Sequence, residues 1–155
     1  MRNKLPIYLA IIFTLLIGIL YFVERYKIIV NISHSLPNRF FLVDTYDKNP
    51  ELNSYIAFIP PENPYYRQIF VKIVKGKADD SVKIIQNKLY INEQFLGIVK
   101  TKSKLGKPLK PGPTGTIPLD YFFVYSPHKD SYDSRYSDIG WISRASIVGV
   151  ALPLF

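Results

Sequence analysis

Two serines and a proline mark the first place in this sequence where chemistry is expected. Ser33 and Ser35 lie two residues apart in the segment NISHSLPNRFF, just ahead of Pro37. Proline biases the residue before it toward an extended backbone, so we expect Ser33 to Leu36 to be extended. Alternate side chains of an extended run project to the same side, so both hydroxyls would share one surface. Serines before a proline are also common in turns, and a serine nucleophile needs a base.

The candidate base is Lys72, in the segment IFVKIVKGKADD. Its neighbours are apolar on both faces of the expected strand: Phe70, Val71, Ile73 and Val74. Burial disfavours an ammonium group and lowers the lysine pKa, so a neutral amine would be available to take a proton from a serine hydroxyl. The alternative is a lysine on an edge strand, where its charge discourages aggregation.

The two histidines offer a different base. His34 would point away from Ser35 in an extended backbone. His128 lies in SPHKD, and with Asp130 or Asp133 it would complete a Ser-His-Asp arrangement. A single histidine in such a segment is more often a solvated loop residue, so we favour the lysine.

The elements that position these residues begin with a long apolar segment. Leu5 to Val23 contains nineteen residues without a charge, and as a helix it would be about 28 Å long, enough to cross a bilayer. The alternative is a cleavable secretory signal, but ERYK follows where a small-residue cleavage site would stand. The sequence therefore predicts a retained membrane anchor.

The charges beside this segment predict its orientation. Those before it are Arg2, Lys4 and the amino terminus, and those after it are Glu24, Arg25 and Lys27. The modest positive bias favours a cytoplasmic N-terminus in a bacterial inner (cytoplasmic) membrane. We therefore expect residues 1–24 to form a cytoplasmic stub and transmembrane anchor, and residues 25–155 to form one extracytoplasmic or periplasmic domain.

From Lys27 onward the sequence predicts a mainly β domain of short strands. The β-rich runs are KIIVNI, RFFLVDTY, SYIAFIP, IFVKIV, SVKII, KLYI, YFFVYS and SIVGVALPL. Only Gln86 and Asn87 separate SVKII from KLYI, which is a hairpin-length connection, and INEQF predicts a second tight turn. Proline and glycine recur from Lys102 to Gly115, which predicts a long surface loop.

Composition restricts the chemistry further. The chain of 155 residues has no cysteine and a formal net charge of +8. It therefore has no disulfide, zinc-thiolate site or cysteine nucleophile, and we expect neither a metal nor another cofactor. Its lysines are scattered along the sequence rather than gathered in one run, so we expect no nucleic-acid partner.

Three blocks, in this order, resemble those of the signal peptidase I superfamily of serine proteases, and specifically of the TraF-type conjugative transfer signal peptidases. SHSLP is similar to the nucleophile box, VKIVKGKADDSV to the lysine box, and SPHKDSYDSRY to the block that ends in Ser-x-Asp-Ser-Arg-Tyr. The resemblance extends from the apolar segment through VGVALPL. The short spacing leaves no room for the extra domain of larger signal peptidases, which favours the TraF branch.

The resemblance implies a signal peptidase-like β fold and a Ser-Lys dyad. Ser35 would be the nucleophile and Lys72 the general base. The oxyanion hole would be formed by the Ser33 hydroxyl and the Ser35 backbone N–H. The third block would supply three supporting residues: Ser131 to orient the lysine, and Asp133 with Arg135 to brace the site.

The implied function is that of a membrane-anchored serine endopeptidase that processes an exported precursor, such as a pilin, for conjugation or type IV secretion. Its partners would be that precursor and the lipid bilayer. One alternative is a general signal peptidase I that removes signal peptides from secreted proteins. Another is a non-catalytic anchored component of the secretion machine that binds pilin.

The sequence departs from the family pattern in loops. Ala78 and Asp79 stand where the lysine box usually reads Pro-Gly, and Ser126-Pro127 replaces a glycine-led turn. Because aspartate adopts a positive φ less readily than glycine, we expect these departures to affect loop geometry rather than the proposed catalytic atoms.

Overall fold

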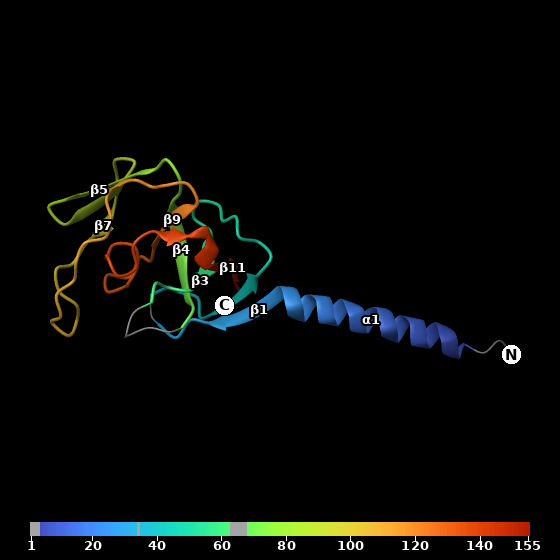
Figure 1. Ribbon diagram of the computed structural model, residues 1–155. Helices are drawn as coiled ribbons and strands as arrows, with labels where there is room; N and C mark the ends of the chain where they lie inside the picture. The colour runs from blue at the N-terminus through green and yellow to red at the C-terminus, as the bar shows by residue number, and fades with distance from the viewer. Residues whose placement is uncertain (1–3, 34, 63–67) are drawn as a thin grey trace.

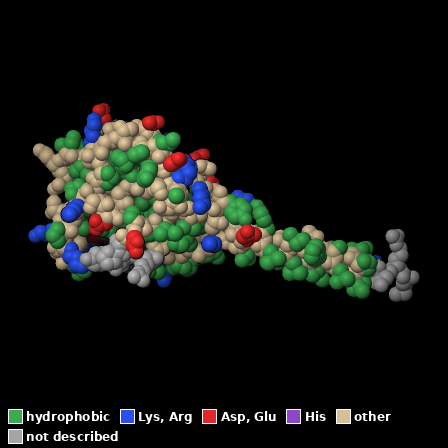
Figure 2. Space-filling model, in the orientation of Figure 1, with side chains coloured by type: hydrophobic (Ala, Val, Ile, Leu, Met, Phe, Trp, Pro, Cys, Tyr) green, Lys and Arg blue, Asp and Glu red, His purple; other side chains and the backbone are tan. Residues whose placement is uncertain are grey.

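A long helix projects from a β domain in the computed structural model, which describes residues 4–33, 35–62 and 68–155 (Figure 1). Helix α1 spans Leu5–Arg25, and none of its residues is buried. It is long and apolar enough to cross a membrane, and Figure 2 shows apolar side chains along its length. The expected N-terminal apolar helix is therefore confirmed. Arg2 and His34, which entered the sequence predictions, lie outside the described residues.

Helix α1 passes directly into the first strand. The helix ends at Arg25, and β1 (Tyr26–Val30) begins at the next residue. The Arg25 Nε donates to Asp44 Oδ1 at 3.0 Å, and its carbonyl accepts hydrogen bonds from the Thr45 backbone N–H at 2.9 Å and hydroxyl at 2.8 Å. These bonds fasten the end of the helix to the sheet.

The β domain contains two antiparallel sheets. The larger sheet has the strand order β1-β2-β11-β3-β4-β9-β10, and beyond β1 its strands are β2 (Phe40–Asp44), β3 (Tyr55–Phe58), β4 (Phe70–Gly76), β9 (Tyr121–Tyr125), β10 (Ile142–Ser143) and β11 (Ile147–Pro153). The smaller sheet has the order β7-β6-β5-β8, with strands β5 (Ser81–Ile85), β6 (Lys88–Ile91), β7 (Gln94–Ile98) and β8 (Gly115–Thr116). A short 3-10 helix, η1 (Arg144–Ser146), precedes β11. The predicted fold class, mainly β with short antiparallel strands, is confirmed.

Both predicted hairpins occur in the smaller sheet. Gln86 and Asn87 have φ of 49° and 62° between β5 and β6, and Asn92 and Glu93 have φ of 47° and 68° between β6 and β7. Two consecutive positive φ angles are the mark of a type I′ turn, whose twist matches that of the strands it joins. The predicted loop from residue 102 to 115 lies mostly at the surface.

The expected base, Lys72, lies on β4, which is an interior strand of the larger sheet. Val71 belongs to an apolar cluster that includes Leu36, Phe41 and Val43. Val74 belongs to another, which includes Ile56, Phe58, Phe122 and Val124. Since side chains alternate along a strand, Lys72 projects to the same face as Val74.

Candidate active site

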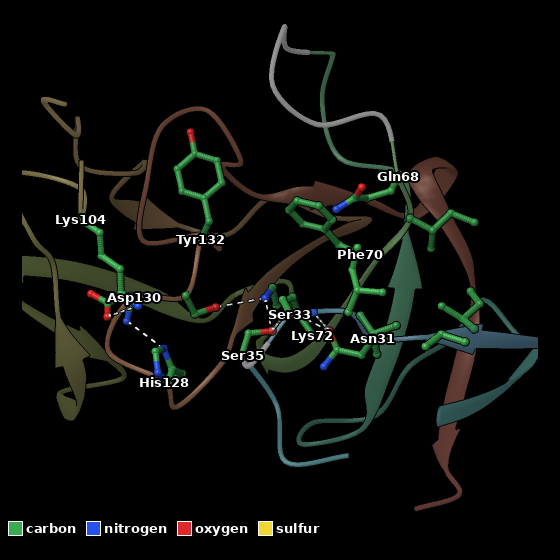
Figure 3. Close-up of a pocket in the computed structure, with 16 residues that line it drawn as sticks. Asn31, Ser33, Ser35, Gln68, Phe70, Lys72, Lys104, His128, Asp130 and Tyr132 are labelled. Atoms are coloured by element: carbon green, nitrogen blue, oxygen red, sulfur yellow. Dashed lines mark hydrogen bonds and ion pairs between the residues drawn. The ribbon is translucent and has the colours of Figure 1, made fainter. Parts of the chain in front are cut away.

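Lys72 joins two serines from distant parts of the chain (Figure 3). Its Nζ donates to Ser35 Oγ at 2.9 Å and to Ser131 Oγ at 3.0 Å. Lys72 is 4% exposed and Ser35 is 6% exposed. The structure therefore brings together the expected nucleophile, the expected base and the expected orienting serine.

Ser33 lies beside Ser35, but not on an extended backbone. The two Oγ atoms are 2.7 Å apart. The chain bends at Ser33 and turns at Ser35, so the expected extended run is wrong. The reason is Asn31, whose Oδ1 accepts hydrogen bonds from the Ser33 backbone N–H at 3.2 Å and from the Ser33 hydroxyl at 2.8 Å. An asparagine that binds the backbone two residues ahead folds the chain into an Asx-turn.

Asn31 is a site residue that the sequence interpretation missed. Besides holding Ser33, its Nδ2 donates to the Asn38 carbonyl at 3.3 Å, and its backbone N–H donates to the Arg39 carbonyl at 2.7 Å. It thus closes the loop that carries both serines. The signal was present, because asparagine two residues before a serine is a turn former.

The environment of Lys72 favours the neutral amine. Desolvation by burial lowers its pKa from 10.5 to about 8. The Asp133 carboxylate opposes this shift, and the Arg135 guanidinium adds to it. The ring centroid of Phe70 lies 5.7 Å from the Nζ and contributes apolar surface to the surroundings. The pKa of Lys72 therefore lies in the range suited to a general base.

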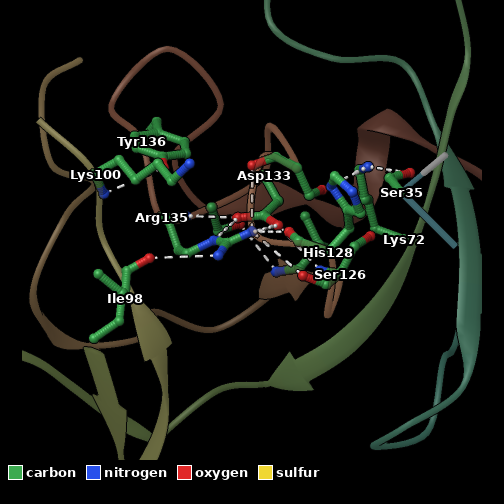
Figure 4. A network of polar contacts seen from close by, with 12 residues as sticks. Ser35, Lys72, Ile98, Lys100, Ser126, His128, Asp133, Arg135 and Tyr136 are labelled. Atoms are coloured by element: carbon green, nitrogen blue, oxygen red, sulfur yellow. Dashed lines mark hydrogen bonds and ion pairs between the residues drawn. The ribbon is translucent and has the colours of Figure 1, made fainter. Parts of the chain in front are cut away.

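A buried ion pair holds the loop that carries Ser131 (Figure 4). The Arg135 Nε donates to Asp133 Oδ1 at 2.8 Å, and its Nη2 donates to Oδ2 at 2.9 Å. The same Nη2 donates to the carbonyls of Ser126 at 3.3 Å, His128 at 3.2 Å and Ser131 at 3.2 Å. Arg135, which was expected to brace the site with Asp133, therefore bonds three backbone carbonyls as well as the carboxylate.

His128 lines the pocket, but both nearby carboxylates are engaged elsewhere. Its Nδ1 accepts a hydrogen bond from the Asp130 backbone N–H at 3.2 Å. The Asp130 carboxylate pairs with Lys100 and Lys104, while Asp133 pairs with Arg135. This geometry favours the lysine over the histidine as the base. Within the described ranges, no group of three or more His, Cys, Asp or Glu side chains could hold a metal ion.

The three hydroxyls and the amine face a pocket of about 410 Å³. One wall is formed by residues 29–33, at and after the end of β1, which is the edge strand of the larger sheet. The other lining segments are residues 68–72, at the start of β4, and residues 128–132. A pocket beside an edge strand is suited to a peptide in extended conformation.

Comparison with known proteins gives three matches. Residues 1–155 match the family described as "Signal peptidase, peptidase S26". A protein of Sinorhizobium fredii named "Probable conjugal transfer protein TraF" is 50% identical over 46 residues, which are 30% of this chain and 23% of that protein. The match thus spans less than a quarter of this relative. The crystal structure of a signal peptidase I from Enterococcus faecalis has 27% sequence identity and a TM-score of 0.45, and the match covers 67% of this chain and 97% of that one.

Proposed function

The chain belongs to the signal peptidase family, peptidase S26, and we propose that it is a membrane-anchored serine endopeptidase with a dyad of Ser35 and Lys72. The family match confirms the resemblance of the three sequence blocks. The observation that carries the dyad is the buried Lys72 Nζ, 2.9 Å from the Ser35 Oγ. An amine with a pKa of about 8 at this distance is suited to remove the serine proton.

The proposed reaction is acyl transfer. Ser35 Oγ attacks the scissile carbonyl carbon while its proton passes to Lys72 Nζ. The Ser33 hydroxyl, once its proton turns from Asn31 Oδ1 toward the substrate, and the Ser35 backbone N–H stabilise the resulting oxyanion. When the peptide C–N bond breaks, the protonated Lys72 gives its proton to the leaving amine. A water molecule, deprotonated by Lys72, then attacks the ester, and Lys72 returns this proton to Ser35 Oγ as the ester C–O bond breaks and the acyl group leaves.

We propose that the substrate is an exported precursor of a conjugation or type IV secretion apparatus, with a pilin subunit as the first candidate. The support is the 46-residue match to a protein whose name links it to conjugal transfer. A general signal peptidase would instead cleave many secretory precursors. Incubating the full chain in detergent with a panel of precursors separates the two, because we expect cleavage of the pilin precursor alone. Product mass then distinguishes hydrolysis from closure of the acyl enzyme by an amine.

We propose that α1 anchors the chain in the inner membrane and that residues 25–155 face the extracytoplasmic side. The length and composition of α1 support an anchor, and the charges flanking it support the orientation. Protease added to intact spheroplasts should digest the domain. Full protection until lysis would overturn the orientation, and with it the assignment of an exported substrate.

A serine-directed acylating inhibitor tests whether the site is catalytic. We expect the full chain to be labelled, and Ser35→Ala to lose the label. Ser134→Ala is the matched control, because the Ser134 hydroxyl is buried on the loop that carries Ser131, where it accepts a hydrogen bond from the Val124 backbone N–H at 2.9 Å. Absence of labelling in the wild-type chain would favour the non-catalytic pilin-binding alternative.

A further inference from the structure

The hydroxyl of Ser126 is a buried polar group that the proposed reaction does not use. Ser126 is 0% exposed. Its Oγ has no hydrogen-bond partner among residues 4–33, 35–62 and 68–155. Buried hydroxyls nearly always have a partner, because leaving water without one is costly.

The strand register places Ser126 opposite the base. Strands β4 and β9 are antiparallel, with Val74 opposite Val124 and Ile73 opposite Tyr125. One further step along this register sets Ser126 against Lys72. Residues directly opposite in an antiparallel pair project to the same face, with Cβ atoms about 4.5–5.5 Å apart. Figure 4 accordingly shows Ser126 near Lys72.

The backbone of Ser126 is fixed, whereas its hydroxyl is not. Its N–H donates to Asp133 Oδ2 at 3.0 Å, and its carbonyl accepts a hydrogen bond from Arg135 Nη2 at 3.3 Å. The buried ion pair therefore bonds both the N–H and the carbonyl of Ser126. The side chain can still rotate about its Cα–Cβ bond, and this rotation sets the direction in which the Oγ points.

The bonding needs of a neutral amine indicate what this hydroxyl does. A lysine that accepts the Ser35 proton must point its lone pair at Ser35, which leaves two N–H groups to be directed elsewhere. Ser131 Oγ, at 3.0 Å, accepts one of them. We propose that Ser126 is a positioning residue whose Oγ accepts the other N–H of Lys72 and so aims the lone pair at Ser35. This inference rests on the proposed function.

The proposal predicts a specific change in the pH dependence of the reaction rate when Ser126 is replaced. The charged and titratable groups around Lys72 are Asp133, Arg135, His128, Asp130, Tyr132 and Lys104, and replacing Ser126 changes none of them. A hydroxyl acceptor stabilises an ammonium more than an amine, so its loss should lower the pKa of Lys72. The acid limb of the rate profile should then move to lower pH while the plateau rate falls. Loss of packing alone would lower the rate without moving the limb.

The test measures kcat against pH for the full chain in detergent, using a fluorogenic peptide with alanine on the N-terminal side of the scissile bond. For Ser126→Ala we expect kcat to fall about tenfold, the loss typical of one buried hydrogen bond, and the acid limb to move to lower pH. Ser126→Thr should restore both. Ser126→Cys, which keeps the shape but is a weak acceptor, should resemble the alanine variant. Ser134→Ala should leave the limb in place.

The outcomes separate this inference from the proposed function. If Ser126→Ala or a folded Ser126→Cys keeps the wild-type limb while Lys72→Met is inactive, the role of Ser126 is overturned and the dyad stands. If the wild-type chain and Lys72→Met cleave the peptide equally, the dyad itself is overturned.

Discussion

Lys72 Nζ lies 2.9 Å from Ser35 Oγ, although the two residues are 37 positions apart in the chain. Three strands separate β1 from β4 in the order of the larger sheet, yet residues of both strands line the same pocket. Leu36 holds the segment after β1 close to β4, because it is buried in the same apolar cluster as Val71. The burial of one leucine thus positions the hydroxyl next to it.

Lys72→Arg should be as inactive as Lys72→Ala, because a guanidinium stays protonated at any workable pH. Wild-type activity should rise with pH through about 8, as the lysine loses its proton. Rates of precursor cleavage between pH 6 and 10 provide the measurement. Lys75→Arg is the control, since the Lys75 Nζ donates to Asn53 Oδ1 away from the site. Substantial activity in Lys72→Arg would return attention to His128.

Ser33→Ala should lower kcat by about 10²–10³, the usual loss for one oxyanion donor, with KM nearly unchanged. Ser35→Ala should leave no measurable cleavage, because it removes the nucleophile. Steady-state kinetics of the two purified variants checks both statements. Equal effects of the two substitutions would contradict their distinct roles.

Lys72→Met should stabilise the protein at neutral pH. A pKa lowered from 10.5 to about 8 means that the unfolded chain binds more protons between these values. Wild-type stability therefore rises with pH across this window, and below it the buried ammonium costs up to about 3 kcal/mol. Thermal unfolding in detergent should show the variant more stable at pH 7 and the advantage shrinking toward pH 10.5. An advantage independent of pH would show that the lysine charge is not its source.

Arg135→Met should destabilise the domain by about 3–5 kcal/mol, because it leaves the Asp133 carboxylate buried and unpaired. Arg144→Met is the control. Arg144 lies partly exposed, where it pairs with Asp120 at 2.7 Å and also donates to the Lys48 carbonyl at 3.0 Å and to Asn49 Oδ1. An exposed ion pair contributes about 0–1 kcal/mol. Denaturant unfolding of the two variants gives the comparison. Similar losses would mean that the buried pair is not the brace described above.

Asp79→Gly should stabilise the domain by up to about 1 kcal/mol, since Asp79 has a φ of 71° and glycine adopts this region without steric cost. Asp80→Gly should do the opposite, because Asp80 Oδ2 accepts the Lys77 backbone N–H at 2.8 Å and its Oδ1 accepts the Asn92 Nδ2 at 2.6 Å. The thermal unfolding midpoints of the two variants, compared with that of the wild-type chain, provide the measurement. A lower midpoint for Asp79→Gly would show that the aspartate contributes more than its backbone geometry.

Local patterns made several features predictable from the sequence. The apolar run of α1, the two-residue connection at Gln86 and Asn87, and the apolar neighbours on both sides of Lys72 each concern residues close together in the chain. The structure has all three. Asp79, which stands where the lysine box of the resembled family usually reads glycine, has a φ of 71°.

Other features depend on contacts that local patterns do not contain. The bend at Ser33 depends on a side-chain bond from Asn31, which outweighs the preference set by Pro37. The position of Ser126 opposite Lys72 depends on the register between β4 and β9. These strands are neighbours in the sheet, but in the sequence all strands of the smaller sheet lie between them. Similarly, the Asp130 carboxylate pairs with Lys100 and Lys104, which are distant in the sequence, so its lack of a role beside His128 emerged only from the folded chain.

The direct connection between α1 and β1 fixes the distance between the helix and the pocket. No residue separates the helix from the strand, and Asp44 and Thr45 hold the helix end. If α1 lies in the bilayer as proposed, the pocket would stand at a set distance from the lipid surface. A substrate with its own membrane segment would then present to the pocket only the bond that lies at this distance.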